Sequence, residues 1–301
     1  MIRKDFIKSA SLLLGGAALT PLSALTAAPT VGTGPLVLKK ALGYAMIEED
    51  LPLVDKLMLV RDLGFDGVEF NSPLDFGIDE ILRAKEKSGI QTASTVNKDH
   101  WSKPLSDPDA TKRSFIVDSI ARSLEETRQL GGDTVLVVPG VVNDKVSYEQ
   151  AYRTAQDSIR QLIPYVEKTG VKVGLENVWN NFILSPVEAK RFVEEIGHPL
   201  IGWYFDIGNV LRYGWPEHWI QTLGSHIFKL HIKEFSREKM NKEGLWKGFD
   251  VEIGRGDINW PAVMQSLREV GHSGGWITAE VKGGDRHHLR KIALQIDEVM
   301  K

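Results

Sequence analysis

The chain has 301 residues, of which 42% are hydrophobic and 26% are charged, with a formal net charge of −3 and no cysteine. The absence of cysteine excludes disulfides, thiolate nucleophiles, cysteine-ligated zinc and iron–sulfur clusters, so any bound metal must use oxygen and imidazole ligands. The acidic balance without a long basic run argues against nucleic acid and anionic membranes as partners and favours a small-molecule site.

Residues 1–28 predict an export signal. Basic residues at the start, Arg3, Lys4 and Lys8, precede a run of small and apolar residues that continues to Ala28. This run is too short and too rich in Gly and Ala for a membrane-spanning helix. The signal resembles the twin-arginine type, with Lys in place of the second Arg. We expect its removal to leave a periplasmic protein without membrane contact; the alternative is an amphipathic N-terminal helix that stays attached.

Short apolar or β-branched runs then alternate with longer stretches of helical period. Eight runs predict strands, at residues 37–44, 66–70, 91–96, 134–138, 171–177, 201–207, 227–232 and 276–281. Helices are predicted at residues 51–63, 78–87, 107–130, 148–170, 257–270 and 287–300. One more helix begins at Ser185, because Pro186 suits the first helical position and Glu188 can complete a capping box. A polar loop is predicted at residues 235–257.

Alternating strands and helices indicate a parallel sheet, either open or closed into a barrel. The count of eight favours an α/β fold with a single (β/α)8 TIM barrel over residues 29–301, while an open sheet of six or seven strands is the alternative. The nucleotide motifs G-x-G-x-x-G and G-x-x-x-x-G-K-[ST] do not occur.

Four predicted strands end in residues of types that commonly bind divalent metals. These residues are Glu176, Asp206, His231 and Glu280, and barrel enzymes gather their chemistry at this end of the strands. Each residue alone is typical of a helix cap or a buried core group. Together, three carboxylates around one imidazole would repel each other unless a cation balanced them. The donor set suits one Mn2+, Mg2+ or Co2+ ion better than structural zinc.

These four strand ends, with the glycine-rich loop at residues 254–260, resemble the xylose isomerase-like superfamily of sugar phosphate isomerases and epimerases, here as an exported branch. The resemblance implies a metal held by Glu176, Asp206, His231 and Glu280. It further implies that Glu176 and Glu280 are catalytic and lie on opposite sides of a sugar, one removing a proton and the other returning it. The intermediate is an enediolate.

Six further residues are predicted to contact the substrate: Glu69, His100, Trp101, Asn209, Lys233 and Arg237. The resemblance places Glu69 near the sugar and matches Arg237 with an arginine that contacts substrate oxygens in ketose epimerases. Lys233 lies two residues after a strand-end ligand and therefore on the same side of the strand. Asn209 stands where many members have a substrate-contacting His, and Phe182 where ketose epimerases have a carboxylate. These departures argue against epimerisation of a free ketose.

The sequence therefore predicts a metal-dependent sugar isomerase or epimerase that acts on a non-phosphorylated carbohydrate. Export and the absence of a clear phosphate cradle beyond Gly283 and Gly284 favour a non-phosphorylated sugar or glycoside over a phosphorylated sugar. The alternatives are a lyase that eliminates the aglycone of a 3-keto-glycoside, a non-catalytic periplasmic sugar-binding protein, and a DNA-repair endonuclease on the same barrel. A homo-oligomer is compatible with each of these predicted functions.

Overall fold

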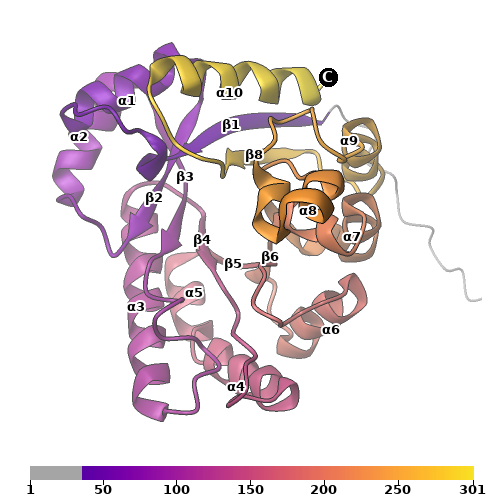
Figure 1. Cartoon of the computed structure of the whole chain (residues 1–301). Helices are drawn as coiled ribbons and strands as arrows, with labels where there is room; N and C mark the ends of the chain where they lie inside the picture. The colour runs from indigo at the N-terminus through magenta and orange to yellow at the C-terminus, as the bar shows by residue number, and fades with distance from the viewer. Residues whose placement is uncertain (1–35) are drawn as a thin grey trace, which may run out of the picture. The chain divides into compact units, whose positions relative to one another are not determined.

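Eight parallel strands close into a barrel in sequence order (Figure 1). The structure is a computed structural model that describes residues 36–301. The strands are β1 (Val37–Gly43), β2 (Gly67–Ser72), β3 (Gln91–Asn97), β4 (Thr134–Val137), β5 (Lys172–Glu176), β6 (Ile201–Asp206), β7 (Ile227–Ile232) and β8 (Gly274–Ala279). The predicted barrel is confirmed, and its closure excludes the open sheet. The predicted export signal, residues 1–28, lies outside the described residues.

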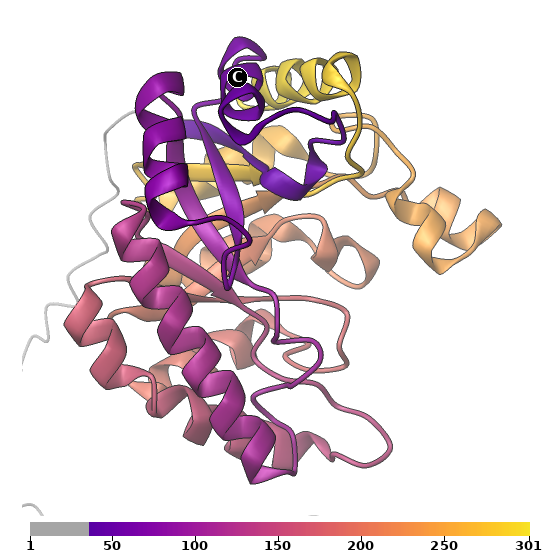
Figure 2. The same ribbon diagram turned by 90° about the vertical axis from the view of Figure 1, so that its left-hand side faces the viewer.

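Helices follow the strands and surround the barrel (Figure 2). They are α1 (Leu53–Asp62), α2 (Ile78–Ser88), α3 (Ala110–Gln129), α4 (Tyr148–Arg160), α5 (Ile163–Thr169), α6 (Pro186–Ile196), α7 (Pro216–Leu223), α8 (Arg237–Glu243), α9 (Trp260–Glu269) and α10 (Arg286–Val299). Short 3-10 helices are η1 (Tyr44–Met46), η2 (Asn209–Arg212), η3 (Gly224–His226) and η4 (Leu245–Phe249). The α6 start is as predicted, because the Ser185 hydroxyl accepts the Glu188 N–H at 3.2 Å.

Two predictions about helices are wrong. The single helix expected over residues 148–170 is divided into α4 and α5, because Pro164 in the first turn of α5 has no N–H to offer the carbonyl of Arg160. The polar loop expected over residues 235–257 contains α8 and η4. Ser236 caps α8 by accepting the N–H of Lys239. Helices this short carry too few turns for a readable apolar period.

The strand register fixes the spacing of side chains at one end of the barrel. Asp206 on β6 is paired with His231 on β7, and Glu176 on β5 is paired with Tyr204 on β6. Glu280 directly follows β8. Because the strands are parallel, their carboxyl ends meet at the same mouth, where the loops leave room for a site.

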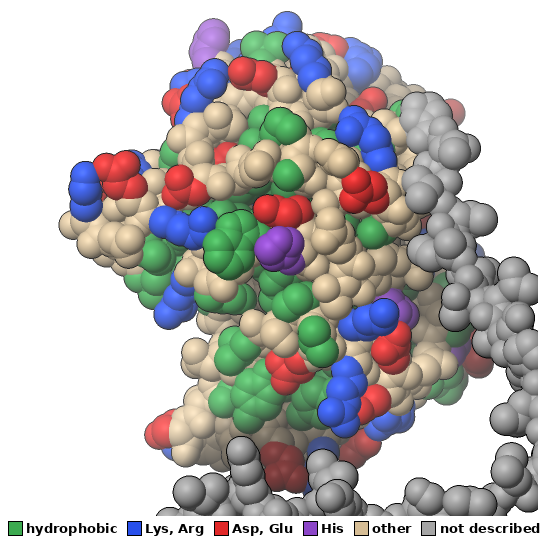
Figure 3. Space-filling view, turned by 90° about the vertical axis from the view of Figure 1, so that its right-hand side faces the viewer, with side chains coloured by type: hydrophobic (Ala, Val, Ile, Leu, Met, Phe, Trp, Pro, Cys, Tyr) green, Lys and Arg blue, Asp and Glu red, His purple; other side chains and the backbone are tan. Residues whose placement is uncertain are grey.

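The face with α7, α8 and α9 mixes hydrophobic, acidic and basic side chains (Figure 3). Trp215, 53% exposed, and Tyr213, 40% exposed, are among the large hydrophobic side chains that reach the surface of the barrel. Within residues 36–301, no helix combines the length and apolar character that crossing a membrane requires.

Candidate functional site

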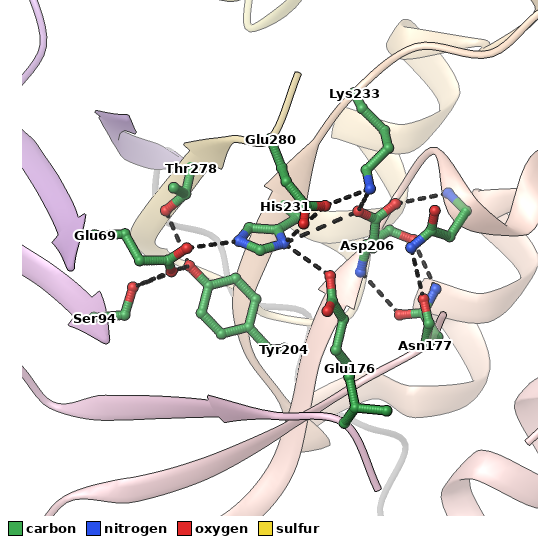
Figure 4. A network of polar contacts seen from close by, with 12 residues as sticks. Glu69, Ser94, Glu176, Asn177, Tyr204, Asp206, His231, Lys233, Thr278 and Glu280 are labelled. Carbon is green, nitrogen blue, oxygen red and sulfur yellow. Dashed lines mark hydrogen bonds and ion pairs between the residues drawn. The ribbon is translucent and has the colours of Figure 1, made fainter. Parts of the chain in front are cut away.

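The four predicted metal ligands converge at the carboxyl end of the barrel (Figure 4). Glu176, Asp206, His231 and Glu280 each place one ligand atom so that all four lie within 4.8 Å of one another. Nδ1 of His231 is 2.9 Å from Glu176 Oε1 and 3.4 Å from Glu280 Oε2. Glu176, Asp206 and His231 are buried, whereas the side chain of Glu280 is 47% exposed. One side of the cluster is thus open to an incoming molecule.

This cluster fits a divalent cation. In the described part of the chain, Oδ2 of Asp206 is a buried oxygen that accepts no hydrogen bond and faces the ammonium group of Lys233 as its ion-pair partner. Lys233 Nζ lies 2.9 Å from Oδ2 of Asp206 and also pairs with Glu280. Gly208 makes room for this lysine, because a Cβ there would meet Lys233 Cγ at 2.3 Å. Three carboxylates and one imidazole match Mn2+, Mg2+ or Co2+.

The orientation of His231 is set from behind by Glu69 on β2. Nε2 of His231 is 3.1 Å from Glu69 Oε1, which leaves Nδ1 to face the other carboxylates. Glu69 Oε2 accepts hydrogen bonds from Tyr204, at 2.6 Å, and from Ser94. The Tyr204 hydroxyl also lies 2.9 Å from Thr278 Oγ1. A carboxylate on the far nitrogen of a ligating His is a common supporting contact in metal sites. Glu69, predicted as a substrate contact, is thus placed behind the imidazole.

Asn177 holds Asp206 in place across the gap between β5 and β6. Its Oδ1 accepts the Asp206 N–H and its Nδ2 donates to the Asp206 carbonyl, both at 2.8 Å. The Asn209 N–H donates to Asp206 Oδ1 at 2.6 Å, and Asn209 Nδ2 donates to the Asn177 carbonyl at 2.9 Å. Asn209 lines the cavity, and its side-chain amide links the ends of β5 and β6, from which Glu176 and Asp206 extend.

The two catalytic candidates differ in proton affinity. Burial raises the pKa of Glu176 to about 7, and the charge of Glu280 adds to this effect. Burial also raises the pKa of Asp206 to about 6, against the opposing effect of Lys233. At Glu280 the effect of burial is outweighed by Lys233 and His231, which hold its pKa well below the usual range. Without a bound cation, Glu176 therefore holds a proton more readily than Glu280.

A cavity of about 870 Å³ opens beside the cluster, and Glu176, His231 and Glu280 line it. His100 and Trp101, from the loop after β3, line it together with Lys233 and Asn209. His100 is buried, and its Nδ1 accepts the N–H of Val138 at 3.3 Å. Trp101 is 54% exposed. Four of the six predicted substrate contacts therefore share this cavity.

Arg237 lies apart from the cavity. Its Nε donates to the Leu211 carbonyl at 2.8 Å and its Nη2 to the Gly214 carbonyl at 2.7 Å. The guanidinium also stacks on Trp215, with 5.2 Å to the ring centroid. In this arrangement the arginine holds the loop between β6 and α7.

Glu234 orders the glycine-rich loop over residues 254–260. Its carboxylate is buried and accepts the Gly254 N–H at 2.8 Å, the Ile258 N–H at 3.2 Å and the Trp260 indole N–H at 2.9 Å. Gly256 is required for this approach, because a Cβ there would lie 2.5 Å from the Phe235 carbonyl. The loop is thus anchored to the end of β7 beside His231.

Four residues of this hydrogen-bonded network are not predicted from the sequence: Asn177, Ser94, Tyr204 and Thr278. Tyr204 and Thr278 stand two residues before Asp206 and Glu280, and side chains two residues apart share one face of a strand. This spacing is the signal that could have placed them one layer below the metal ligands.

Several curated proteins are similar to this chain. A 2-oxo-tetronate isomerase from Haemophilus influenzae is 26% identical over 265 residues, which cover 81% of this chain and 93% of the isomerase. A 2-epi-5-epi-valiolone 7-phosphate 2-epimerase from Actinoplanes is 26% identical over 179 residues. This match spans 55% of the chain and 61% of the epimerase, and a match to an uncharacterised Methanocaldococcus jannaschii protein spans 55% of that protein.

Solved structures share the fold. A 3-keto-D-glucoside 4-epimerase from E. coli superposes with a TM-score of 0.72 at 17% identity, covering 87% of this chain and 98% of that one. A D-psicose 3-epimerase from Clostridium cellulolyticum superposes with a TM-score of 0.70 at 19% identity, covering 88% and 100%. The model of the xylose isomerase-like TIM barrel family matches residues 57–299. With its closed barrel and its quartet of Glu, Asp, His and Glu at the strand ends, the chain belongs to the xylose isomerase-like TIM barrel family.

Proposed function

We propose that the protein is a metal-dependent isomerase or epimerase that acts through an enediolate on a non-phosphorylated sugar or sugar derivative. The quartet of Glu176, Asp206, His231 and Glu280 at the base of an open cavity carries this proposal. The isomerase and the epimerases among the relatives support it. One Mn2+, Mg2+ or Co2+ ion is the cofactor that we assign to the quartet.

The proposed step is a proton transfer between substrate carbon and carboxylate. A bound cation stabilises the negative charge that develops on the substrate oxygens. Glu176 and Glu280 extend from the ends of β5 and β8 toward the same imidazole nitrogen. One removes the proton next to the carbonyl, and the other returns a proton. Return to the opposite face of the same carbon gives an epimer, and return to the neighbouring carbon gives an isomer.

The substrate contacts that we propose are Lys233, His100, Trp101 and Asn209, which line the cavity. Glu69 acts through His231 in this proposal. A contact from Arg237 to the substrate stays a prediction, and it would require the guanidinium to leave the carbonyls that it now binds.

The start of α10 supports a substrate without phosphate. A helix N-terminus that binds phosphate offers free N–H groups. Here the His288 N–H donates to Asp285 at 2.9 Å, and the Arg286 N–H donates to Glu49 at 2.9 Å. A phosphate at this end would meet two carboxylates. Gly283 packs against Met46, where a Cβ would lie 2.5 Å from the Met46 carbonyl, so this glycine is explained by packing.

An NMR time course in D2O tests the proposed function. Mg2+-loaded protein is incubated with a panel of free ketoses, free aldoses and 3-keto-glycosides, and parallel samples contain EDTA. Deuterium entering a sugar together with its conversion to an epimer or isomer, abolished by EDTA, is the expected result. Absence of metal-dependent exchange in every sample would contradict the proposal and favour a sugar-binding protein.

The lyase is the second candidate, and the size of the cavity favours it, because about 870 Å³ accommodates more than one sugar ring. A carboxylate removes the proton next to the ketone, the C–O bond to the aglycone breaks, and the aglycone leaves as an alcohol after taking up a proton. The other product is an unsaturated keto sugar. In the same time course, aglycone release from a 3-keto-glycoside identifies this reaction.

Export to the periplasm belongs to the same proposal and rests on the sequence of residues 1–28. Cell fractionation of the full-length chain, followed by N-terminal sequencing of the mature protein, tests it. Recovery of an uncleaved chain in the cytoplasm would contradict it. A homo-oligomer stays a prediction that sedimentation can test.

A further inference from the structure

Three aromatic side chains form one wall of the cavity, which we call the aromatic wall: Trp179, Trp246 and Phe249. The ring of Trp179 lies 4.8 Å from that of Trp246 and 4.9 Å from that of Phe249, centroid to centroid. Trp246 is nevertheless 67% exposed. A large ring that is packed on its neighbours and still open to the cavity presents apolar surface to a ligand.

The aromatic wall is held in place by the segment around α8 and η4, which stands out from the barrel in Figure 2. Gly248, between the two aromatic residues of η4, lies flat on the ring of Phe235, where a Cβ would meet the ring at 2.3 Å. The Gly248 carbonyl accepts the Ser236 N–H at 2.8 Å. On the other side, the Trp179 indole N–H donates to the Asn209 carbonyl at 2.8 Å. The wall is therefore pre-organised.

The aromatic wall adjoins the metal site directly. Lys233 Nζ lies 5.6 Å from the centroid of the Phe249 ring. The same ammonium group pairs with Asp206 and Glu280. A sugar ring that reaches Glu280 therefore has the wall beside it, and a substituent on that ring would lie over the exposed face of Trp246.

We propose that the aromatic wall binds the second ring of a glycoside whose first ring reacts at the metal site. This inference rests on the proposed function and names its substrate class. The second ring has an apolar face and is either a further sugar or an aromatic aglycone, because aromatic side chains bind such faces while leaving polar edges in water. A monosaccharide at the four ligands leaves the aromatic wall uncovered.

Equilibrium binding tests this proposal without turnover. The probes are methyl and phenyl hexosides and a disaccharide of the same hexose, in the gluco, galacto and manno series, all without a ketone and therefore without an acidic proton. Calorimetry measures their affinity for the Mg2+-loaded protein. We expect the phenyl hexoside, the disaccharide or both to bind about tenfold more tightly than the methyl hexoside. The phenyl and disaccharide arms distinguish an aglycone site from a second sugar site.

Trp246→Ala should remove this tenfold preference and leave the affinity for the methyl hexoside within about twofold. Trp246→Phe should keep most of the preference, because a flat ring remains. Tyr165→Ala is the matched control, since Tyr165 is a 38% exposed aromatic residue on α5 that lines neither described cavity. It should change none of the affinities.

Equal affinity of the methyl and larger probes in the wild type would overturn this inference while leaving the proposed function intact. Equal weakening of all probes by Trp246→Ala would also overturn it. Failure of every probe to bind, with no metal-dependent exchange in D2O, would overturn the inference together with the proposed function. A changed sedimentation coefficient in Trp246→Ala, with the preference intact, would assign the wall to contact between copies of the chain.

Discussion

Glu176 and Glu280 face the same nitrogen of His231 but differ in exposure and in proton affinity, as expected for groups with different roles. Replacing either by Gln keeps the size of the side chain and removes its ability to accept a proton. We expect Glu176→Gln and Glu280→Gln each to lower turnover by roughly 10²–10⁴-fold. Initial rates with parallel measurement of bound metal check this. Wild-type turnover in either variant would rule out the paired-carboxylate mechanism.

Glu69 should affect metal binding through His231 rather than through the substrate. Glu69→Gln weakens the contact that directs Nδ1 of His231 toward the cluster, so we expect Mn2+ affinity to fall about 10–100-fold. Titration calorimetry with Mn2+ measures this loss of affinity. The variant His231→Ala shows how far Mn2+ affinity falls when the imidazole itself is removed. Unchanged Mn2+ affinity in Glu69→Gln would show that the barrel alone orients the imidazole.

His100 makes the stability of the fold depend on pH. Burial lowers the pKa of His100 to about 4, whereas an unfolded His titrates near 6.5. The folded protein therefore holds this imidazole neutral while the unfolded chain takes up a proton. The stabilisation is fully present above pH 6.5 and is lost as the pH falls toward 4. Between pH 7 and pH 5, protonation of this group in the unfolded chain should lower the free energy of unfolding by about 2 kcal/mol.

The variant His100→Gln isolates this effect, because its amide oxygen can still accept the Val138 N–H but does not titrate. The stability of the wild type relative to the variant, from urea unfolding, should fall by about 2 kcal/mol between pH 7 and pH 5. A difference that stays constant with pH would show that the pKa of His100 is the same in the folded and the unfolded protein, and would contradict this prediction.

Among the larger elements, the loop over residues 254–260 depends on one side chain, Glu234. Glu234→Ala leaves the N–H groups of Gly254 and Ile258 and the indole of Trp260 without their acceptor. We expect a loss of roughly 2–4 kcal/mol in the free energy of unfolding, measured by chemical denaturation. Glu238→Ala on the exposed face of α8 is the control and should change stability by less than about 0.5 kcal/mol. Equal effects of the two substitutions would contradict this role.

Strands such as β4 and β6 were predictable because each is a short, fully buried run of mainly apolar residues. The ends of β5 to β8 indicated the proposed metal ligands in advance. Val173 to Glu176 illustrates the pattern, since the apolar run stops at the ligand. The short helices α7 and α8 were not predictable, because two turns give no reliable period. Pro164 in the sequence marks the division between α4 and α5, because it has no N–H to continue the hydrogen bonding of α4.

Contacts between segments that are distant in the sequence could not be predicted either. Glu69 lies on β2 and His231 on β7, so only closure of the barrel, in which β1 pairs with both β2 and β8, brings them together. Arg237 was matched by its distance in sequence from His231, but the fold directs its guanidinium to the carbonyls of Leu211 and Gly214. Sequence spacing fixes which strand end a residue occupies, while the direction of a loop side chain depends on neighbouring loops.

For the barrel as a single cooperative unit, a cation that binds the folded state alone should raise thermal stability. At a free Mn2+ concentration about 100 times its Kd, the gain is about 2.7 kcal/mol. For a domain of this size we expect an increase in Tm of about 5–10 °C, reversed by EDTA and absent in His231→Ala. Scanning calorimetry measures it. An equal increase in His231→Ala would place the stabilising cation elsewhere.

The four proposed metal ligands come from the ends of consecutive strands, β5 to β8, and their spacing is set by hydrogen-bonded neighbours rather than by loops. His100 and Trp101 instead come from the loop after β3, and Trp246 and Phe249 from the segment around η4. Substitutions in these loops can therefore change which substrate binds without displacing the four strand-end residues. Such a division separates reactivity from selectivity, so related chains could diversify their substrates by exchanging loops around a constant reaction centre.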